Sequence, residues 1–211
     1  MPVAALYDIH GNLPALEAVL SQVPADATIV VGGDVVAGGP QAVEVLERLR
    51  GLGDRVVWIR GNGDRELDPN EEGLAPPAAL DETRAQLSEE QIAFLVGLPP
   101  TATVEGVLYC HATPRNDLDI FTEETPEERL VPIFADVDAD VVVCGHTHMQ
   151  FDRVIAGTRV VNAGSVGMPY DEPPGAYWLL DLEHRRTDYD GTPVASASRE
   201  EVLSYFTERG L

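Results

Sequence analysis

Short apolar runs alternate with segments of helical periodicity in the first third of the chain. Their lengths and β-branched residues predict buried strands at Val3–Tyr7, Thr28–Val31 and Arg55–Ile59. Between these runs, apolar residues three or four positions apart predict one helix that begins at Pro14 and a second that follows Pro40. The apolar face expected for the second helix consists of Val43, Leu46 and Leu49. This β-α-β-α-β order predicts a parallel sheet with right-handed crossovers.

The second half of the chain is dominated by further short apolar runs. They predict strands at Ala102–Val104, Val107–Cys110, Val141–Cys144, Asp152–Ile155, Arg159–Val161 and Ala176–Leu182. Helices are expected from Ser88 to about Val96, between Thr125 and Ala135, and from about Ser198 to Glu208. The segment Leu67–Pro77 is rich in Pro, Glu and Gly and is predicted to be a loop. Two strand-rich halves with helices outside indicate two packed sheets in a single domain spanning residues 1–211.

Charge and composition narrow the class of protein. The 211 residues carry 36 acidic and 14 basic side chains, a formal net charge of −22 at pH 7. A field of this sign repels phosphate backbones, so a nucleic acid polymer is not an expected partner. No apolar run approaches the roughly 20 residues that span a bilayer, and the N-terminus lacks the pattern of a signal peptide. Cys110 and Cys144 lie in apolar runs and are expected to be buried thiols, so we expect a cytoplasmic protein with no membrane partner.

Side chains that can bind metals follow five of the apolar runs. They are Asp8 and His10, Asp34, Asn62 and Asp64, His111, and His146 and His148. Ligands of open α/β sheets bind beyond the carboxyl ends of the strands, so these side chains are expected to converge. Taken singly, each is more often a turn residue, a helix cap or a hydrogen-bonded histidine. Four of the five histidines lie at run ends, however, and this coincidence favours a metal site; the fifth, His184, lies in a charged segment expected to be a surface turn.

The types of ligand indicate which metal and how many ions. Mixed imidazole, carboxylate and amide ligands suit Mn, Fe, Ni, Co or Zn. Their number exceeds the four ligands of a single tetrahedral site. A shared carboxylate can hold two ions about 3.5–4 Å apart, the spacing used for in-line displacement at phosphorus. We therefore expect two divalent transition-metal ions, with Mn as the first choice and Fe, Ni, Co or Zn as alternatives.

The order of these motifs resembles the calcineurin-like metallophosphoesterase family. The motifs are Asp8-x-His10, Gly33-Asp34, Gly61-Asn62, His111 and Gly145-His146-x-His148. The flanking segments 8–12 and 164–167 are similar to a small bacterial and archaeal branch of compact phosphodiesterases and enzymes that cleave diadenosine tetraphosphate. The resemblance implies a four-layer α/β/β/α sandwich of two mixed β-sheets flanked by helices. It also implies a small phosphorylated substrate, such as a nucleotide or a phosphodiester.

The resemblance assigns roles to the individual residues. Asp8, His10 and His148 would hold the first metal, and Asn62, His111 and His146 the second. Asp34 would bridge the two metals. A hydroxide between the ions would attack phosphorus in line with the leaving oxygen, because two cations bring the pKa of a shared water close to neutral.

One position departs from the pattern of the phosphatase branches, where a His follows the Asn and can protonate the leaving group. Here that position is Gly63, followed by Asp64. General acid catalysis typically contributes about 10²–10⁴-fold, so its absence disfavours monoesters and phosphoproteins. Diesters with a good leaving group and nucleotide anhydrides are affected less. Arg115 can bind a phosphate through two hydrogen bonds or pair with nearby acidic residues. The candidate catalytic residues are Asp34, Asn62, Asp64, His111 and Arg115.

Several other polar and aromatic residues have two interpretations. Asn12 can cap the helix at Pro14 or reach the site. Ser165 can line the site, and Tyr170 and Trp178 can stack on a base or pack in the core. The leading hypothesis is a metal-dependent phosphodiesterase or dinucleoside polyphosphate hydrolase. The alternatives are a broad phosphomonoesterase and a non-catalytic scaffold of the same fold. A third alternative, a DNA-repair nuclease, is disfavoured by the acidic net charge.

Overall fold

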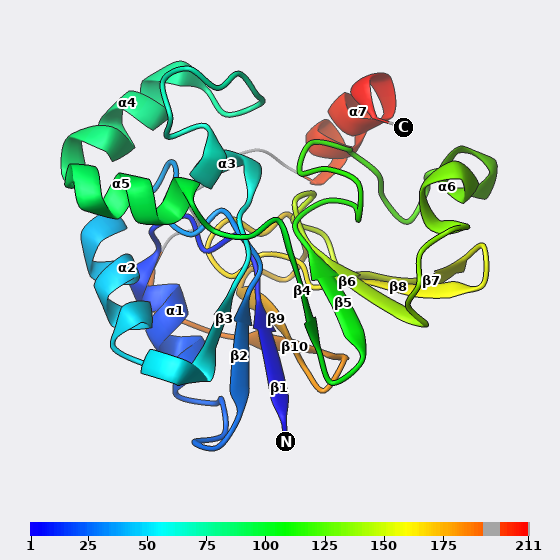
Figure 1. Cartoon of the computed structure of the whole chain (residues 1–211), viewed down its shortest axis with the longest axis horizontal. Coiled ribbons are helices and arrows are strands. Elements are labelled where there is room, and N and C mark those ends of the chain that lie inside the picture. Colours follow the sequence, from blue (N-terminus) through cyan, green and yellow to red (C-terminus); the bar gives the residue numbers. More distant parts are fainter. Residues whose placement is uncertain (192–198, 211) are drawn as a thin grey trace.

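Two five-stranded sheets stack against each other in the computed structural model, which describes residues 1–191 and 199–210 (Figure 1). The first sheet has the order β10-β9-β1-β2-β3. Strands β1, β2 and β3 are parallel, whereas β9 is antiparallel to both β1 and β10. The bounds of its strands are β1 Val3–Leu6, β2 Thr28–Val31, β3 Val56–Trp58, β9 Ala176–Leu180 and β10 Glu183–Thr187.

The second sheet is also mixed and has the order β4-β5-β6-β8-β7. Strands β5, β6 and β8 are parallel, and β4 and β7 run antiparallel at the two edges. The bounds are β4 Thr101–Val104, β5 Val107–Cys110, β6 Val141–Cys144, β7 Phe151–Ile155 and β8 Thr158–Asn162. The carboxyl ends of the parallel strands of both sheets point toward the same end of the molecule (Figure 1).

Helices cover the outer faces of the two sheets. Their bounds are α1 Leu13–Leu20, α2 Ala42–Arg50, α3 Asn62–Arg65, α4 Pro77–Gln86, α5 Glu89–Val96, α6 Glu127–Phe134 and α7 Arg199–Arg209, with a 3-10 turn at Gly53–Arg55. Helices α1 and α2 lie outside the first sheet, α6 lies outside the second, and α7 lies near the carboxyl ends of the strands (Figure 1). Among the described residues, no helix has both the length and the apolar character needed to cross a membrane.

Strand β1 shows why the apolar runs carry no polar alternation. Ala4 and Leu6 pack into the cluster beneath the helices, whereas Val3, Ala5 and Tyr7 pack into the cluster between the two sheets. Successive side chains of a strand point to opposite faces, so a strand that is covered on both faces must be apolar throughout.

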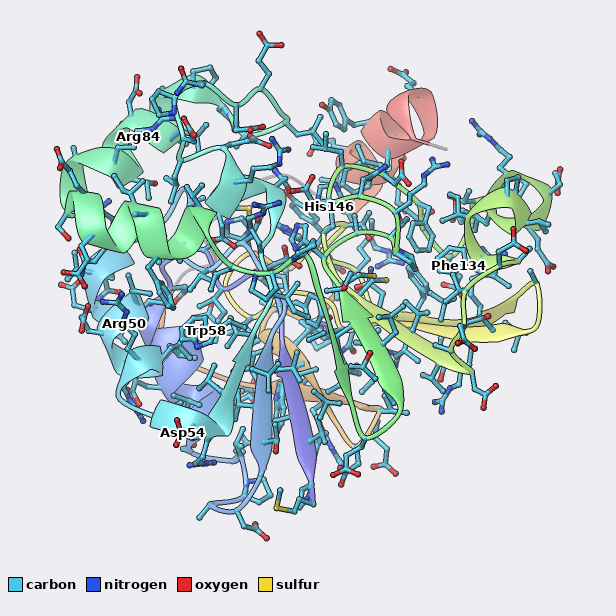
Figure 2. All side chains as sticks on the ribbon, in the orientation of Figure 1. Arg50, Asp54, Trp58, Arg84, Phe134 and His146 are labelled. Atoms are coloured by element: carbon cyan, nitrogen blue, oxygen red, sulfur yellow. The ribbon has the colours of Figure 1, made fainter. Side chains whose placement is uncertain are left out.

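A third apolar cluster fills the space between α6 and the second sheet. Phe134 of α6 lies in it, with its ring 5.7 Å from that of Phe121 (Figure 2). The layers therefore run helix, sheet, sheet, helix, and the expected four-layer sandwich of two mixed sheets is confirmed.

Three local predictions differ from the structure. Helix α4 was not predicted, because its apolar positions are few and only Leu80 and Thr83 are buried. The predicted strand Ala176–Leu182 ends at Leu180. The charged segment around His184 is the edge strand β10 and not a surface turn; its first four residues are exposed, so this edge strand is polar on both faces.

The buried face of α2 is also shifted from the prediction. It consists of Ala42, Val45, Leu46 and Leu49, and Val43 is only half-buried. The predicted C-terminal helix is present as α7, although its expected first residue, Ser198, lies outside the described residues.

Candidate metal centre

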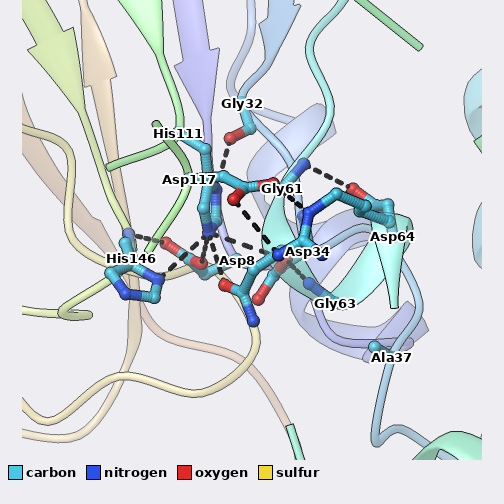
Figure 3. A network of polar contacts seen from close by, with 12 residues as sticks. Asp8, Gly32, Asp34, Ala37, Gly61, Gly63, Asp64, His111, Asp117 and His146 are labelled. Atoms are coloured by element: carbon cyan, nitrogen blue, oxygen red, sulfur yellow. Dashed lines mark hydrogen bonds and ion pairs between the residues drawn. The ribbon is translucent and has the colours of Figure 1, made fainter. Parts of the chain in front are cut away.

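The side chains singled out at the ends of the apolar runs converge at one end of the two sheets, and Figure 3 shows Asp8, Asp34, Asp64, His111 and His146 among them. Asp8 and His10 follow β1, Asp34 follows β2, Asn62 opens α3 after β3, His111 follows β5, and His146 and His148 follow β6. All but His146 are buried, and His146 is half-buried. Five segments far apart in the sequence thus bring carboxylate, imidazole and amide groups to one place.

Five of these residues adopt a backbone conformation that residues other than glycine rarely occupy. The φ angles are 52° at Asp8, 48° at His10, 51° at Asp34, 66° at His146 and 57° at His148. A left-handed residue costs roughly 1–2 kcal/mol, and such strain persists where the surrounding structure enforces it. The chain turns sharply after β1, β2 and β6, and these turns aim the side chains at the cluster.

The carboxylate of Asp8 lies at the centre of the cluster. Its Oδ2 accepts a hydrogen bond from the backbone N–H of His146 at 2.9 Å. Its Oδ1 is buried and has no hydrogen-bond partner, yet it lies 3.3 Å from Nε2 of His148, 3.9 Å from Nε2 of His111 and 4.0 Å from Nε2 of His10. A buried, unpartnered carboxylate oxygen is costly, and a cation at this point would remove the cost.

Three histidines are held in the same tautomer by backbone carbonyls. The Nδ1 atoms of His10, His111 and His148 lie 2.6 Å, 2.9 Å and 2.7 Å from the carbonyl oxygens of Ala37, Gly32 and Met168. Each Nδ1 must donate a proton to its carbonyl, which leaves Nε2 with a free lone pair. Histidines that bind metals are oriented in this way.

The two oxygens of Asp34 face different histidines. Oδ2 lies 3.8 Å from Nε2 of His10, and Oδ1 lies 3.6 Å from Nε2 of His111. Oδ1 also accepts a hydrogen bond from the N–H of Gly63 at 2.7 Å. Asp8, His10 and His148 form one group able to hold a metal ion, and Asp8, Asp34 and His111 form another. Asp8 is common to both groups, whereas the carboxylate of Asp34 belongs to the second group and also faces His10 of the first.

Asp64 binds backbone and does not point at the histidines. Its Oδ2 accepts from the N–H groups of Asp34 and Gly61, at 2.8 Å and 2.9 Å, and its Oδ1 accepts from Val35 at 3.0 Å (Figure 3). Burial, followed by the charge of Asp34, raises the pKa of Asp64 to about 7, against the lowering effect of these bonds. Asp64 is thus a positioning residue that joins the loops after β2 and β3.

The two joined loops approach each other so closely that only glycine fits at Gly33. Gly33 has a φ of +96°, and a Cβ atom there would lie 2.4 Å from the backbone nitrogen of Gly61 and 2.7 Å from Nδ1 of His111. The Gly-Asp and Gly-Asn steps of the motifs therefore have a steric origin.

Glu66 orients Asn62 and was not singled out from the sequence. Nδ2 of Asn62 donates to Oε1 of Glu66 at 3.0 Å, which turns Oδ1 toward Nε2 of His111 at 3.2 Å. The Glu66 carboxylate is buried and also accepts from the backbone N–H groups of Leu74 and Ala75. Its one signal in the sequence is its place four residues after Asn62, on the same face of a helical turn.

Burial and charge shift the pKa values of the cluster in opposite directions. Burial, and then the neighbouring His111, lowers the pKa of His146 to about 4. Burial alone would also lower the pKa of His148, but the charges of Asp8 and Asp34 outweigh burial and raise it. Asp8 shows the reverse balance: burial raises its pKa, and the nearby histidines, His148 first, bring it below its usual value. The neighbouring histidines therefore favour the ionised form of the Asp8 carboxylate.

The remaining candidates are placed less directly. Arg115 forms an ion pair with Asp119 at 2.5 Å and lies outside the cavity beside the cluster. Asn12 caps α1, with its Oδ1 accepting from Ala15, and Ser165 donates to the backbone oxygen of Asp8. Trp178 is core, whereas the ring of Tyr170 stacks on His148 with 5.2 Å between centroids and 13° between planes.

A cavity of about 380 Å³ opens directly onto this cluster. His10, Asp34, Asn62, His146 and His148 line its inner end. The cavity gives a small molecule access to the same atoms that could hold metal ions.

Comparisons with known proteins agree with this geometry. The phosphodiesterase YfcE of Escherichia coli is 28% identical over 184 residues, covering 82% of this chain and 84% of that protein. The symmetrical bis(5'-nucleosyl)-tetraphosphatase of Vibrio campbellii is 32% identical over 121 residues, covering 53% of this chain and 45% of that protein. A metallophosphoesterase from Sphaerobacter thermophilus has the same fold, with a TM-score of 0.75, 24% identity, and coverage of 100% and 94%. Residues 1–185 match the calcineurin-like phosphoesterase superfamily domain, and the chain belongs to that superfamily.

Proposed function

We propose that the protein hydrolyses phosphodiester or nucleotide phosphoanhydride bonds with the help of two divalent metal ions. The observation that carries this proposal is the position of Asp34, whose two oxygens face His10 on one side and His111 on the other. Membership of a phosphoesterase superfamily, with a phosphodiesterase and a tetraphosphatase among the relatives, supports the reaction class.

The residues present fit two neighbouring cations. We assign Asp8, His10 and His148 to the first ion and Asn62, His111 and His146 to the second, with Asp34 shared. Oδ1 of Asp8 and the Nε2 atoms of His10, His111 and His148 carry lone pairs and no proton. A cation binds to atoms of this kind. Two bound ions supply Lewis acidity at phosphorus and lower the pKa of a water molecule toward neutrality.

Neighbouring residues hold the candidate ligands Asp34 and Asn62 in place. Asp34 and Asn62 are held by Asp64, Gly63 and Glu66, so their oxygens do not have to reorganise when a substrate enters. Preorganised charge of this kind is the main contribution to catalysis in many enzymes. We propose Mn²⁺ as the preferred ion, because the mixed imidazole, carboxylate and amide ligands suit it. We propose the cytoplasm as the compartment.

The absence of a side chain at Gly63 points to diesters over monoesters. No imidazole can stand there to protonate a poor leaving group, and a Cβ atom at this position would lie 2.9 Å from the Cβ of Ala37. After chelation and reloading with Mn²⁺, we expect bis(p-nitrophenyl) phosphate to be hydrolysed with a higher kcat/KM than p-nitrophenyl phosphate. Release of p-nitrophenol measures both reactions.

Both substrates release p-nitrophenol, so the ratio of their kcat/KM values reports the effect of the second ester group on phosphorus. A higher kcat/KM for the monoester would contradict the proposed preference for diesters. The lack of any metal-restored hydrolysis would contradict the proposed function itself. Zn²⁺ and Ni²⁺ serve as alternative ions in the same assay.

Glu66 offers a test of how Asn62 is positioned. Glu66→Ala frees the amide of Asn62 to rotate, and we expect the affinity for Mn²⁺ to fall by about 10–100-fold, as is typical when the partner of a metal ligand is removed. A Mn²⁺ titration monitored by calorimetry measures this affinity. The matched control is Glu71→Ala, which removes a carboxylate bound to the same arginine, Arg65, as Glu66. Equal affinities in the two variants would show that Glu66 has no such role.

A further inference from the structure

Beyond the candidate ligands, the walls of the cavity are almost entirely apolar. Leu74 and Leu80 lie on one side, and Ile120, Tyr205 and Phe206 lie on the other. The last two belong to α7, which faces the region of α4 across the carboxyl ends of the strands (Figure 1). Among the described lining residues outside the candidate ligands, the tyrosines Tyr170 and Tyr205 contribute the polar side-chain atoms.

Three aromatic rings, Tyr170, Tyr205 and Phe206, line the cavity besides the candidate ligands in the part of the chain that the structure describes. Tyr170 lies against His148 at the inner end. Tyr205 and Phe206 meet edge to face, with their centroids 5.9 Å apart. Phe206 is half-buried, whereas 44% of the surface of Tyr205 is exposed. Such rings can pack on a flat group of a substrate whose phosphate lies at the inner end.

The cavity also lacks cationic side chains. The chain contains no lysine, and its 14 basic residues are all arginines. No arginine lines this cavity in the part of the chain that the structure describes. Arg60, Arg65 and Arg115 line the neighbouring hollow that reaches His111, where Arg65 is paired with Asp117 and Arg115 with Asp119.

The other arginines are bound to protein acceptors as well. Hydrogen bonds to carboxylates or backbone carbonyls engage Arg48, Arg50, Arg55, Arg60, Arg84, Arg129, Arg153, Arg159, Arg185, Arg186 and Arg199. The side chain of Arg209 lies outside the described residues. Hence every arginine whose side chain is described already bonds a protein acceptor, and the Nε atom of Arg60, which has no partner, is buried.

From these two features we infer that the centre takes a single phosphate whose ester arm carries a flat aromatic ring, as in a nucleoside or aryl phosphodiester, in preference to a polyphosphate chain. The inference rests on the proposed function and chooses between its two substrate classes. The ions neutralise the phosphate that they touch, but further phosphates would need arginine or lysine partners. They would also meet the field of a chain with a net charge of −22.

The apolar walls also indicate how selective the site is. Stacking of a base on aromatic rings contributes about 1–3 kcal/mol and tolerates any base, because every base has a flat face. Discrimination between bases needs hydrogen bonds to their edges, and the walls contribute few polar atoms beyond two tyrosine hydroxyls. We therefore expect adenine, uracil and phenyl arms to be accepted alike.

Binding of single-phosphate ligands to the Mn²⁺-loaded protein tests this inference without relying on turnover. Calorimetry would compare AMP, UMP and phenyl phosphate with ribose 5-phosphate, which carries the same phosphate without a ring. The three aromatic ligands are expected to bind about tenfold tighter than ribose 5-phosphate, the equivalent of 1.4 kcal/mol. ADP, added with equimolar Mg²⁺, is expected to bind no tighter than AMP.

Variants of α7 assign the effect to the aromatic wall. Tyr205→Ala and Phe206→Ala are expected to reduce the tenfold advantage of AMP over ribose 5-phosphate to about threefold or less. Glu208→Ala, on the same helix and outside the cavity, is the matched control and is expected to retain the advantage.

The outcomes separate this inference from the proposed function. Equal affinities for AMP and ribose 5-phosphate in the unaltered protein would overturn the aromatic subsite. ADP binding about tenfold tighter than AMP would overturn the preference for one phosphate. Either result leaves metal-dependent hydrolysis of bis(p-nitrophenyl) phosphate untouched, whereas failure of ribose 5-phosphate to bind the Mn²⁺-loaded protein would count against the metal centre and both proposals.

Discussion

Replacing Asp34 by Asn is expected to reduce hydrolysis of bis(p-nitrophenyl) phosphate by on the order of 10³-fold, which corresponds to several kcal/mol of transition-state stabilisation. The side chain of Asn has only one oxygen. It therefore cannot present an oxygen to both His10 and His111, as the two oxygens of Asp34 do. Its NH₂ group would also place a proton donor where a cation is proposed. The remaining oxygen can still accept from the N–H of Gly63, so the fold is expected to persist.

Three measurements distinguish this effect from misfolding. Thermal unfolding is expected to stay close to that of the unaltered protein, while the Mn²⁺ content per chain falls. Asp152→Asn, which removes a surface carboxylate paired with Arg159 far from the centre, is the matched control and should retain activity. Substantial turnover by Asp34→Asn protein reloaded with Mn²⁺ would rule out a mechanism with a shared carboxylate.

The convergence of the ligands could be predicted from the sequence because the topology is strongly encoded. An apolar run that is buried on both faces has no polar position until the strand ends, so Asp8, Asp34 and His111 mark strand ends as well as candidate ligands. In parallel strands, these ends must lie at one edge of the sheet. The sequence therefore predicts the position of those ligands that the strand topology alone brings together.

The parts that escaped prediction depend on tertiary contacts. Helix α4 carries a weak apolar pattern, and its position depends on side-chain bonds such as that from Arg84 to the backbone of Leu67. Strand β10 is specified by its pairing with β9 and not by its polar side chains. Propensity and periodicity describe neither kind of contact.

The roles of individual polar residues could be predicted where they depend on local contacts, but not where they depend on the fold. Asn12 could be predicted as a cap because capping is local. Arg115 could equally have met a phosphate or an acid, and its pairing with Asp119 depends on the fold of its loop. Glu66 acts through Asn62 and two backbone groups nine residues or fewer away, a role that no motif announces.

The strained and unpartnered groups of the centre require support from elsewhere in the fold. Left-handed turns at the strand ends and the unpartnered oxygen of Asp8 both cost stability. The compensating contacts are buried acceptors, Asp64 and Glu66, that bind backbone N–H groups of the loops. Stability and the geometry of the centre should therefore fall together when one of these acceptors is removed.

Asp64→Ala is the sharpest case, and it is expected to destabilise the fold by roughly 3 kcal/mol. The change leaves three buried N–H groups, those of Asp34, Val35 and Gly61, without an acceptor, and each unpaired group costs about 1–3 kcal/mol. Relief of the buried carboxylate, whose pKa is raised to about 7, offsets part of that sum. Differential scanning calorimetry should show a fall in Tm of about 6–12 °C.

The same variant should lose activity below its new Tm, because Asp34 and the Gly61 turn are no longer joined by one carboxylate. We expect a loss of about 10–100-fold, the usual effect of removing a group that orients a metal ligand. Asp64→Asn retains one oxygen as an acceptor and should fall between the two proteins in both Tm and activity. If Asp64→Ala loses stability but retains full Mn²⁺-dependent turnover, then Asp64 supports the fold alone, and the loops after β2 and β3 hold their ligands without it.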